Sequence, residues 1–364
     1  RGVSKKAVTI YDIAKRAKVS PMTVSRSLRD DHNAPIKPST AERIRKIAAE
    51  MNYRPSPAAR SLILRKTFNV GFCINDPTFN FFSSLFYPLC EALQAELRAS
   101  GYRLGYYFFR SDMPEEFASF LEDRQVFDAI IVLGRNLTEA EREAIRVSEV
   151  RAISIYEVLP EMASLLIDDE QGGRIAADYL WSRGFRKGTM LYRWLGKPDR
   201  IDWNGRIYGF RQRAKELGLE VQEIEITSRL DVRQFLGYYE AVPPELLQQI
   251  LDSGEAGRCV YCTSDRFAIP LVHHADRLGL KLGEDISIMG FDNIEGQFER
   301  PWEQPRLTTI HRPRDEVGRM AARLAMDFNC KLEGLVHRFP VHLVERSSVG
   351  FGPACPGKQD QSQP

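Results

Sequence analysis

Two pairs of neighbouring residues carry side chains that bind metal ions in other proteins. Cys259 and Cys262 have the Cys-x-x-Cys spacing of zinc ligands, and His274 directly follows His273. The cysteines fall on an apolar run that we expect to form a strand, where residues i and i+3 point to opposite faces, and no second ligand pair follows. The histidines fall in an expected helix, where adjacent residues do not share a face. We therefore expect core thiols, no metal site and no cofactor.

Sequence motifs of common catalytic sites are also missing. Neither G-x-S-x-G nor G-x-x-x-x-G-K-[ST] occurs, and the six histidines have no ligand spacing. Nothing in the sequence pairs a nucleophile with a base. We expect a protein that is not an enzyme.

The composition is typical of a soluble globular protein. Of the 364 residues, 43% are hydrophobic and 27% are charged. No apolar run approaches the roughly 20 residues of a membrane span, and no secretory leader is recognisable at the start. Six scattered cysteines do not make a disulfide framework and fit a reducing cytoplasm. The length suits two or three domains.

The charge is distributed unevenly along the chain. Residues 1–66 hold 16 Lys or Arg and five Asp or Glu, whereas the remainder holds 35 and 44. A basic segment on an acidic body predicts a polyanion partner for that segment. Acidic lipid or protein remains an alternative partner on charge alone.

Three short helices are expected in the basic segment. Thr9 is placed as the N-cap of the first, and Ser20 can cap the second with Pro21 in its first turn. A third helix begins near Pro38-Ser39, where Ser39 could form a capping box with Glu42. The apolar residues at helical spacing, which we expect to face inward, are Ile10, Ile13, Ala14, Ala17, Val24, Leu28, Ile44, Ile47, Ala48 and Met51.

Two helices across a tight turn, braced by a third, are typical of a helix-turn-helix, although a generic three-helix bundle has the same pattern. The residue types decide between them. Val8–Ala14, Val19-Ser20 and Thr23–Arg26 closely resemble the head of the LacI/GalR family of bacterial regulators, and Asn52–Pro55 and Ala58–Leu62 resemble that family's hinge. The resemblance implies sequence-specific DNA binding.

The resemblance also implies roles for individual side chains. Pro21, Met22 and Arg26 match the positions that contact base edges, and a guanidinium such as that of Arg26 can bind guanine O6 and N7 together. Pro21 and Met22 depart from the polar types common there and offer only apolar contact, for instance with a thymine methyl group. The loop around Asn33 is longer than is usual in the family. The positions matched to phosphate contacts are Thr9, Tyr11, Ser20, Thr23, Ser25 and Asn33.

Pro57–Leu62 resembles the family's hinge helix, which forms only on DNA. Two such helices, one from each subunit, enter the minor groove and insert a leucine that kinks the duplex. Here that leucine is Leu62, and Ala59 is the small residue that allows close approach. An ordinary linker remains the alternative, because a helix of about six residues is unstable alone.

From Phe68 onward, apolar runs alternate with amphipathic segments. This alternation predicts parallel sheets with helices on both faces, arranged in two doubly wound lobes with a ligand cleft between them. The expected strands are 69–74, 102–108, 129–133, 152–155, 165–167, 190–192, 223–226, 259–262, 286–289 and 308–310. The expected helices include 89–99, 172–183, 206–217 and 267–278.

The domain boundaries follow from these patterns. We expect a headpiece at 1–55, a hinge at 56–67, an effector-binding and dimerisation domain at 68–350 and a disordered tail at 351–364. Within the large domain, one lobe would comprise 68–157 with 295–310, and the other 158–294 with 311–350.

The family resemblance continues through the large domain. Ile167–Gly173, Gly205–Phe210, Thr263–Asp265, Asp285–Asp292 and Pro305–Ile310 are similar to family motifs and occur in family order. The implied fold is that of periplasmic sugar-binding proteins.

By that match, Arg206 and Asp292 would be the main polar contacts to an effector. A guanidinium donor and a carboxylate acceptor can bind a polyol or a purine edge. Ser264 and Asp265 match another contact position, where Ser264 departs from the common Asn. The further candidates, some of which could simply pack beneath the cleft, are Asn75, Phe82, Tyr156 and Trp203.

The expected function is therefore a homodimeric, operator-binding repressor in the bacterial cytoplasm, controlled by a small molecule that is a sugar rather than a purine. A solute-binding receptor of the same fold is the alternative. The basic head distinguishes the two, because a receptor has no need of one.

Overall fold

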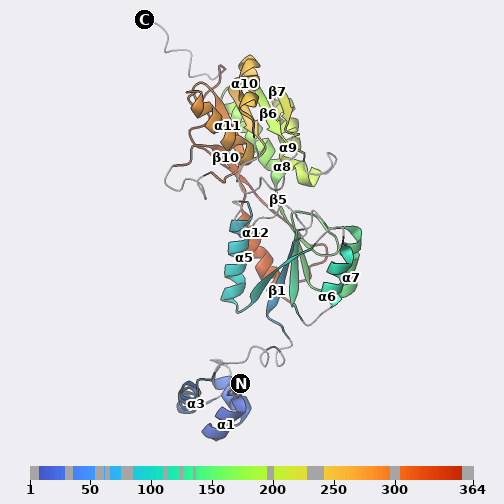
Figure 1. Ribbon diagram of the computed structural model, residues 1–364, viewed down its shortest axis with the longest axis vertical. Coiled ribbons are helices and arrows are strands. Elements are labelled where there is room, and N and C mark those ends of the chain that lie inside the picture. Colours follow the sequence, from blue (N-terminus) through green and yellow to red (C-terminus); the bar gives the residue numbers. More distant parts are fainter. Residues whose placement is uncertain are drawn as a thin grey trace, which may run out of the picture. The chain divides into compact units, whose positions relative to one another are not determined.

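The chain divides into two compact units, Arg1–Thr67 and Phe68–Pro364. The computed structural model (Figure 1) describes residues 8–28, 36–53, 61, 66–74, 85–109, 113–122, 126–133, 137–194, 201–227, 242–295 and 304–354. None of the described helices is both long enough and apolar enough to cross a membrane.

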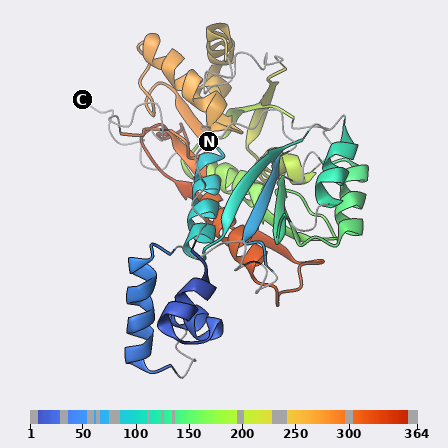
Figure 2. The same cartoon turned by 60° about the horizontal axis from the view of Figure 1, so that its bottom comes forward.

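Three helices form the first unit, as the periodicity predicts (Figure 2): α1 (Ile10–Ala17), α2 (Pro21–Ser27) and α3 (Pro38–Glu50). Thr9 caps α1 in a capping box with Asp12, and Ser20 caps α2 by accepting a hydrogen bond from the Thr23 N–H. Lys18 ends α1 in the left-handed conformation, with φ 52°, so the chain turns tightly into α2. The side chains buried between the helices, all predicted to face inward, are Ile13, Ala14, Ala17, Val24, Ile44 and Ala48.

The capping box expected from Ser39 and Glu42 is wrong. The third helix begins at Pro38, and its N-cap, Lys37, makes no side-chain capping hydrogen bond. Proline suits the first helical position because its φ is fixed and it has no N–H to satisfy. The helix therefore starts one residue before the serine, which lies inside the first turn.

The second unit contains two sheets with six described strands each. The first sheet has the order β11-β5-β4-β3-β1-β2 and is parallel throughout. The second has the order β12-β10-β9-β8-β6-β7 and is parallel except for β12, which runs antiparallel to β10. The strands are β1 (Asn69–Ile74), β2 (Arg103–Phe108), β3 (Ala129–Leu133), β4 (Ala152–Ile155), β5 (Ala163–Ile167), β6 (Lys187–Tyr192), β7 (Glu220–Glu225), β8 (Cys259–Cys262), β9 (Ser287–Asp292), β10 (Thr308–His311), β11 (Val336–Phe339) and β12 (His342–Val344).

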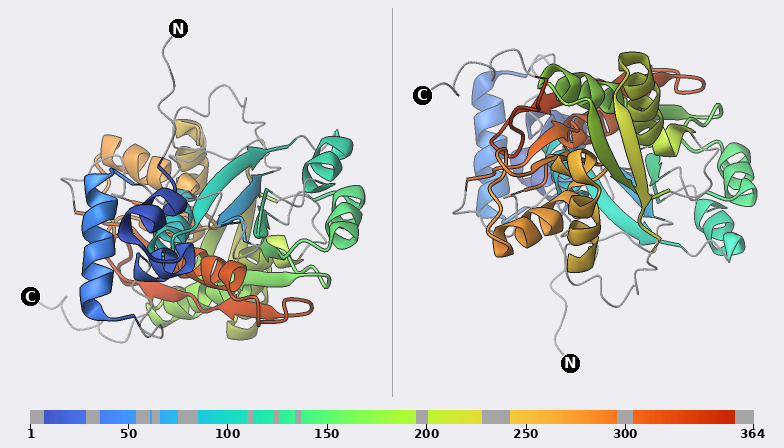
Figure 3. Two further views of the ribbon diagram at one scale, coloured as in Figure 1. Left: turned by 90° about the horizontal axis from the view of Figure 1, so that it is seen from below. Right: turned by 90° about the horizontal axis from the view of Figure 1, so that it is seen from above.

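Helices cover both faces of each sheet, which explains the continuous apolar runs of the central strands. In the first lobe, α5 and α12 pack together on one face, and α6 and α7 cover the other (Figure 1). In the second lobe, α8 and α9 lie on one face and α10 and α11 on the other (Figure 3). The helices are α5 (Tyr87–Ala99), α6 (Pro114–Glu122), α7 (Glu139–Ser148), α8 (Asp169–Ser182), α9 (Ile201–Leu217), α10 (Pro244–Asp252), α11 (Asp265–Arg277) and α12 (Arg314–Met326), with a 3-10 turn at Gly254–Arg258. The two doubly wound parallel lobes are those predicted.

The segments that belong to each lobe are not those expected. The chain crosses between sheets after β5, after β10 and after β11, so 163–167 belongs to the first lobe and 308–311 to the second. The segment 314–339 returns to the first lobe, where β11 pairs with β5. Boundaries at 157, 295 and 310 were therefore wrong. The apolar pattern of a strand does not specify which sheet the strand joins, because that depends on the strand with which it pairs.

Candidate functional site

In the first unit, called the head from here on, α2 presents the face expected to contact DNA bases. Pro21 occupies its first position behind the Ser20 cap, Val24 is buried against the other helices, and Met22 is 62% exposed. Arg26 is also exposed and follows Met22 by four residues, so both lie on one face. Together they can contact a thymine methyl group and the O6 and N7 atoms of guanine.

Some hydroxyl groups expected to bond phosphates are already engaged within the head. Thr9 Oγ1 donates to the Asp12 carboxylate over 2.7 Å, which uses its only proton. Ser20 Oγ lies 2.9 Å from Thr23 Oγ1, so one of these two hydroxyl protons stays available to an outside acceptor. The other described members of the set are Tyr11, which is 69% exposed, and Ser25, which is half-buried.

Several predicted site residues lie outside the described residues. These are Asn33, Ala59, Leu62, Asn75 and Phe82, together with the side chain of Trp203.

In the second unit, backbone contact between α8 and α9 positions Arg206. A Cβ at Gly173 would lie 2.4 Å from the Arg206 carbonyl oxygen. A Cβ at Gly205 would lie 2.9 Å from the Glu170 nitrogen, and one at Gly209 would lie 1.9 Å from the Glu170 oxygen. Glycine is therefore required at these positions, because any Cβ would collide with backbone that cannot rotate away.

Arg206 joins the amino end of α8 to the carboxyl ends of β8 and β9. Its Nη1 donates to the Thr263 carbonyl oxygen over 2.7 Å and lies 3.4 Å from both Asp292 carboxylate oxygens, while its Nη2 donates to Asp169 over 3.2 Å. The guanidinium carbon lies 4.0 Å from the centre of the Phe291 ring. Burial would lower the pKa of Arg206, but the two carboxylates raise it above its ordinary value.

Asp292, the last residue of β9, is surrounded by donors. It accepts from Ser264 Oγ over 2.8 Å and from Arg314 Nη2 over 2.7 Å, and it lies 3.7 Å from Arg312 Nη1. Burial would raise its pKa, but Arg206 and the other two arginines lower it below the ordinary value, so Asp292 is ionised. Its φ of 126° is strained for a residue with a Cβ, as is common at binding sites.

Arg312 connects two of the crossings between the lobes. It follows β10, and it forms a salt bridge from Nε to Asp169 Oδ1 over 2.9 Å and a hydrogen bond from Nη2 to Oδ2 over 3.1 Å, at the start of α8. Its guanidinium lies 5.3 Å from the centre of the Tyr156 ring, just past β4. Tyr156 has a φ of 70°, a second strained position beside the same cluster.

Asp265 is the first residue of α11 and lies close to Asp292. It is 0% exposed, and its carboxylate accepts from Thr309 Oγ1 over 2.8 Å and from the Ile294 N–H over 2.9 Å. Burial, with the charge of Asp292 as a smaller cause, raises the pKa of Asp265 to about 7. This carboxylate supports the ends of β8, β9 and β10, and its contacts favour a positioning role over direct ligand contact.

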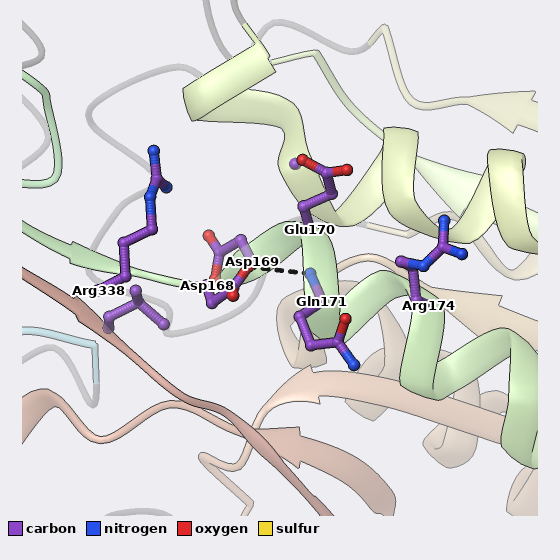
Figure 4. Close-up of a pocket in the computed structure, with 8 residues that line it drawn as sticks. Asp168, Asp169, Glu170, Gln171, Arg174 and Arg338 are labelled. Atoms are coloured by element: carbon purple, nitrogen blue, oxygen red, sulfur yellow. Dashed lines mark hydrogen bonds between the residues drawn. The ribbon is translucent and has the colours of Figure 1, made fainter.

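A pocket of about 430 Å³ opens at the amino end of α8 (Figure 4). Asp168 caps this helix by accepting from the Gln171 N–H over 3.1 Å, and Arg338 reaches the pocket from β11 of the other lobe. The lining residues are Ile167, Asp168, Asp169, Glu170, Gln171, Arg174, Gly205 and Arg338.

The structure brings Arg206, Asp292, Ser264 and Tyr156 together, as expected. It adds Arg312 and Arg314, which were not predicted as site residues. The available signal was Arg-Pro-Arg two residues past the expected strand 308–310, since charged residues near the carboxyl end of a buried parallel strand face a ligand-binding edge.

A helix-turn-helix unit joined to a two-lobed parallel α/β unit is the architecture of a DNA-binding transcription regulator. A family model described as "Bacterial regulatory proteins, lacI family" matches residues 9–56, and one described as "Periplasmic binding protein-like domain" matches residues 177–349. Both units of the chain are thus similar to those of the LacI/GalR family of transcription regulators, which are not enzymes.

Named relatives and solved structures agree with this assignment. The chain is 29% identical over 354 residues to the HTH-type transcriptional repressor PurR of Vibrio atlanticus, covering 94% of this chain and 98% of that protein. It is 28% identical to the Escherichia coli O1:K1 protein of the same name, covering 95% and 98%.

Among solved structures, the lac repressor dimer bound to operator and the anti-inducer ONPF matches with a TM-score of 0.70 and 19% identity, over 95% of this chain and all of that one. A regulator from Enterococcus faecium with bound ribose matches with a TM-score of 0.62 and 22% identity, over 78% and 98%. These structures show the fold.

Proposed function

We propose that this regulator is a repressor whose affinity for its operator is set by a small molecule bound between the two lobes. The observation that carries the proposal is the pair Arg206 and Asp292, buried and 3.4 Å apart at the carboxyl ends of the strands, in a chain that also has a DNA-binding head. A guanidinium donor and an ionised acceptor at such an edge suit a ligand rich in hydroxyl groups.

The head supports specific recognition of DNA. Its net positive charge favours any DNA, because Lys and Arg displace counterions from phosphates. Arg26 would select guanine, and Met22 and Pro21 would contribute apolar contact with a neighbouring thymine. Two heads in a homodimer would bind a roughly twofold-symmetric operator, since half-sites mirror the symmetry of the protein. Such a protein acts in the bacterial cytoplasm, where the chromosome lies.

The effector would act through the connections between the lobes. Arg206, Arg312 and Asp169 join the crossings after β5 and β10, so a ligand that contacts them changes how the lobes meet. The hinge at 56–67 would then favour or disfavour insertion of Leu62 into the minor groove. The ligand acts only through its different affinities for the two arrangements.

We favour a sugar or sugar derivative, and nucleobases are the rival class. A thermal-shift screen of sugars, sugar acids, sugar phosphates, nucleobases and nucleosides decides between them, because a ligand of the folded state adds stability as RT ln(1 + [L]/Kd). Operator DNA is obtained by selection from a random duplex pool with the full-length protein, and its affinity is then measured with and without each hit.

The Arg206→Ala variant should bind operator DNA as the wild-type chain does but lose the response to effector. Arg213→Ala is the matched control, because Arg213 lies on the same helix and pairs at the surface with Asp178 and Glu216. Failure to select any DNA sequence would favour the alternative, a solute-binding receptor. A full effector response in the Arg206 variant would place the ligand elsewhere.

A further inference from the structure

Five charged side chains are buried together where the two lobes connect. The side chains of Arg206, Arg312 and Arg314 are 11%, 9% and 3% exposed, and those of Asp169 and Asp292 are 5% and 2% exposed. They come from the amino ends of α8 and α12, from α9, from the end of β9 and from the crossing after β10. The described part of the chain therefore concentrates an ionic cluster at the site proposed to bind the effector.

The charges in this cluster do not balance. Three guanidinium groups face two carboxylates, which leaves one positive charge in excess. Asp265 is a further buried acid close to Asp292, and its carboxylate accepts hydrogen bonds from Thr309 and Ile294 rather than from an arginine. Its raised pKa, about 7, also means that it supplies only part of a negative charge near neutral pH. An unmatched buried charge is costly, so the cluster favours an anion.

Arg312 is the member of the cluster best able to receive that anion. Both terminal nitrogens of Arg314 donate to Asp292: Nη1 to the Asp292 carbonyl oxygen over 2.8 Å and Nη2 to the Asp292 carboxylate over 2.7 Å. Both terminal nitrogens of Arg206 are likewise engaged. Arg312 donates to Asp169 through Nη2, and its Nε lies 2.9 Å from Asp169 Oδ1, whereas its Nη1 lies 3.7 Å from Asp292 Oδ1, beyond hydrogen-bond distance.

We infer that the effector carries an anionic group, a carboxylate or a phosphate, and that Arg312 is the residue that selects for it. The inference rests on the proposed function of the site. A guanidinium nitrogen donates charge-assisted hydrogen bonds to either anion, so the structure fixes the shared chemistry. The pocket in Figure 4 is not the anion site, because its lining has three carboxylates, Asp168, Asp169 and Glu170, against two arginines.

The test compares neutral and anionic forms of the same molecule. The full-length protein is titrated calorimetrically with pentoses and hexoses, with their aldonates and uronates, with their phosphates, and with nucleosides and nucleoside monophosphates. For one series the anionic form should bind roughly 10–100-fold more tightly than its neutral counterpart, which is the range of a charged hydrogen bond. The series in which the anionic form binds more tightly, the sugar acids or the phosphates, identifies the anion.

Three variants assign the preference to Arg312. The Arg312→Gln variant should lose the anion preference, measured as the ratio of the affinities for the anionic and the neutral form of one molecule. Arg312→Lys, which keeps the charge, should retain a preference with weaker binding. The control Arg213→Gln removes the same charge from the surface of α9 and should behave as wild type.

The possible failures are distinguishable. If a neutral molecule binds as tightly as its anionic counterpart, the anion inference is wrong and the proposed effector site stands. If Arg312→Gln keeps the full anion preference, Arg312 is not the selecting residue. If no compound of any class binds, the proposed function fails as well. The comparison in wild-type protein needs no variant, so a folding defect in Arg312→Gln leaves the anion preference tested.

Discussion

Replacing Gly209 with alanine tests whether the close contact of α8 and α9 determines the site. The new Cβ would lie 1.9 Å from the Glu170 carbonyl oxygen and 2.8 Å from its carbonyl carbon. Non-bonded carbon contacts are optimal at about 3.5–4.0 Å, so the helices would have to separate by roughly 1.5 Å at this point. Because the new Cβ would collide with backbone atoms of Glu170, no side-chain rotation could relieve the contact.

The expected loss of stability combines two opposing effects. Alanine favours a helix over glycine by about 1 kcal/mol, whereas overpacking a tight interface costs about 1–3 kcal/mol and sometimes more. Because the collision is with backbone, the upper end applies, and we expect a net loss of about 2 kcal/mol. For a domain of this size that corresponds to a fall in Tm of roughly 4–8 °C.

The same change should weaken the effector response. Arg206 lies one turn before Gly209 and reaches Asp169 on α8 over 3.2 Å, a distance that separation of the helices would lengthen. Calorimetric unfolding and effector titration measure the two effects. Gln212→Ala is the control, because Gln212 is exposed on the same helix. A Gly209→Ala protein with wild-type Tm and wild-type response would refute the argument that this contact positions Arg206.

Three other predictions concern the head, the hinge and a buried acid. Arg26→Ala should cost roughly 1–3 kcal/mol on the selected operator, and an equal loss on random duplex would contradict a base contact. Leu62→Ala should reduce operator affinity and DNA bending together in a gel-phasing assay, and unchanged bending would remove its proposed role. The raised pKa of Asp265 means that the folded state holds this proton up to about pH 7, whereas the unfolded chain loses it near the ordinary value of 3.8. The stability of the wild-type protein therefore falls as pH rises between these two values. Asp265→Asn should therefore gain in Tm relative to wild type between pH 5 and pH 8 on the order of a few degrees, and a constant difference would contradict the shift.

The head illustrates how far local sequence determines structure. Thr9, Ser20 and Pro21 specify where helices begin through hydrogen bonds and geometry within one turn, so these starts were predictable. Ser39 has the right type for a cap but follows Pro38, and the proline decided the helix start. Where two local signals overlap, the pattern gave the right helix start but the wrong cap.

In the large domain, the sequence alone predicted the strand–helix alternation, and its family resemblance singled out Arg206 and Asp292 as candidate contacts to an effector. It did not determine which sheet receives β5, β10 or β11, because strand pairing depends on backbone hydrogen bonds between segments far apart in the chain. The crossings that follow from this pairing carry Asp169 and Arg312 to the same place. The excess of buried positive charge is thus a property of the tertiary structure, since it arises only when residues 169, 206, 292, 312 and 314 meet in a region shielded from water.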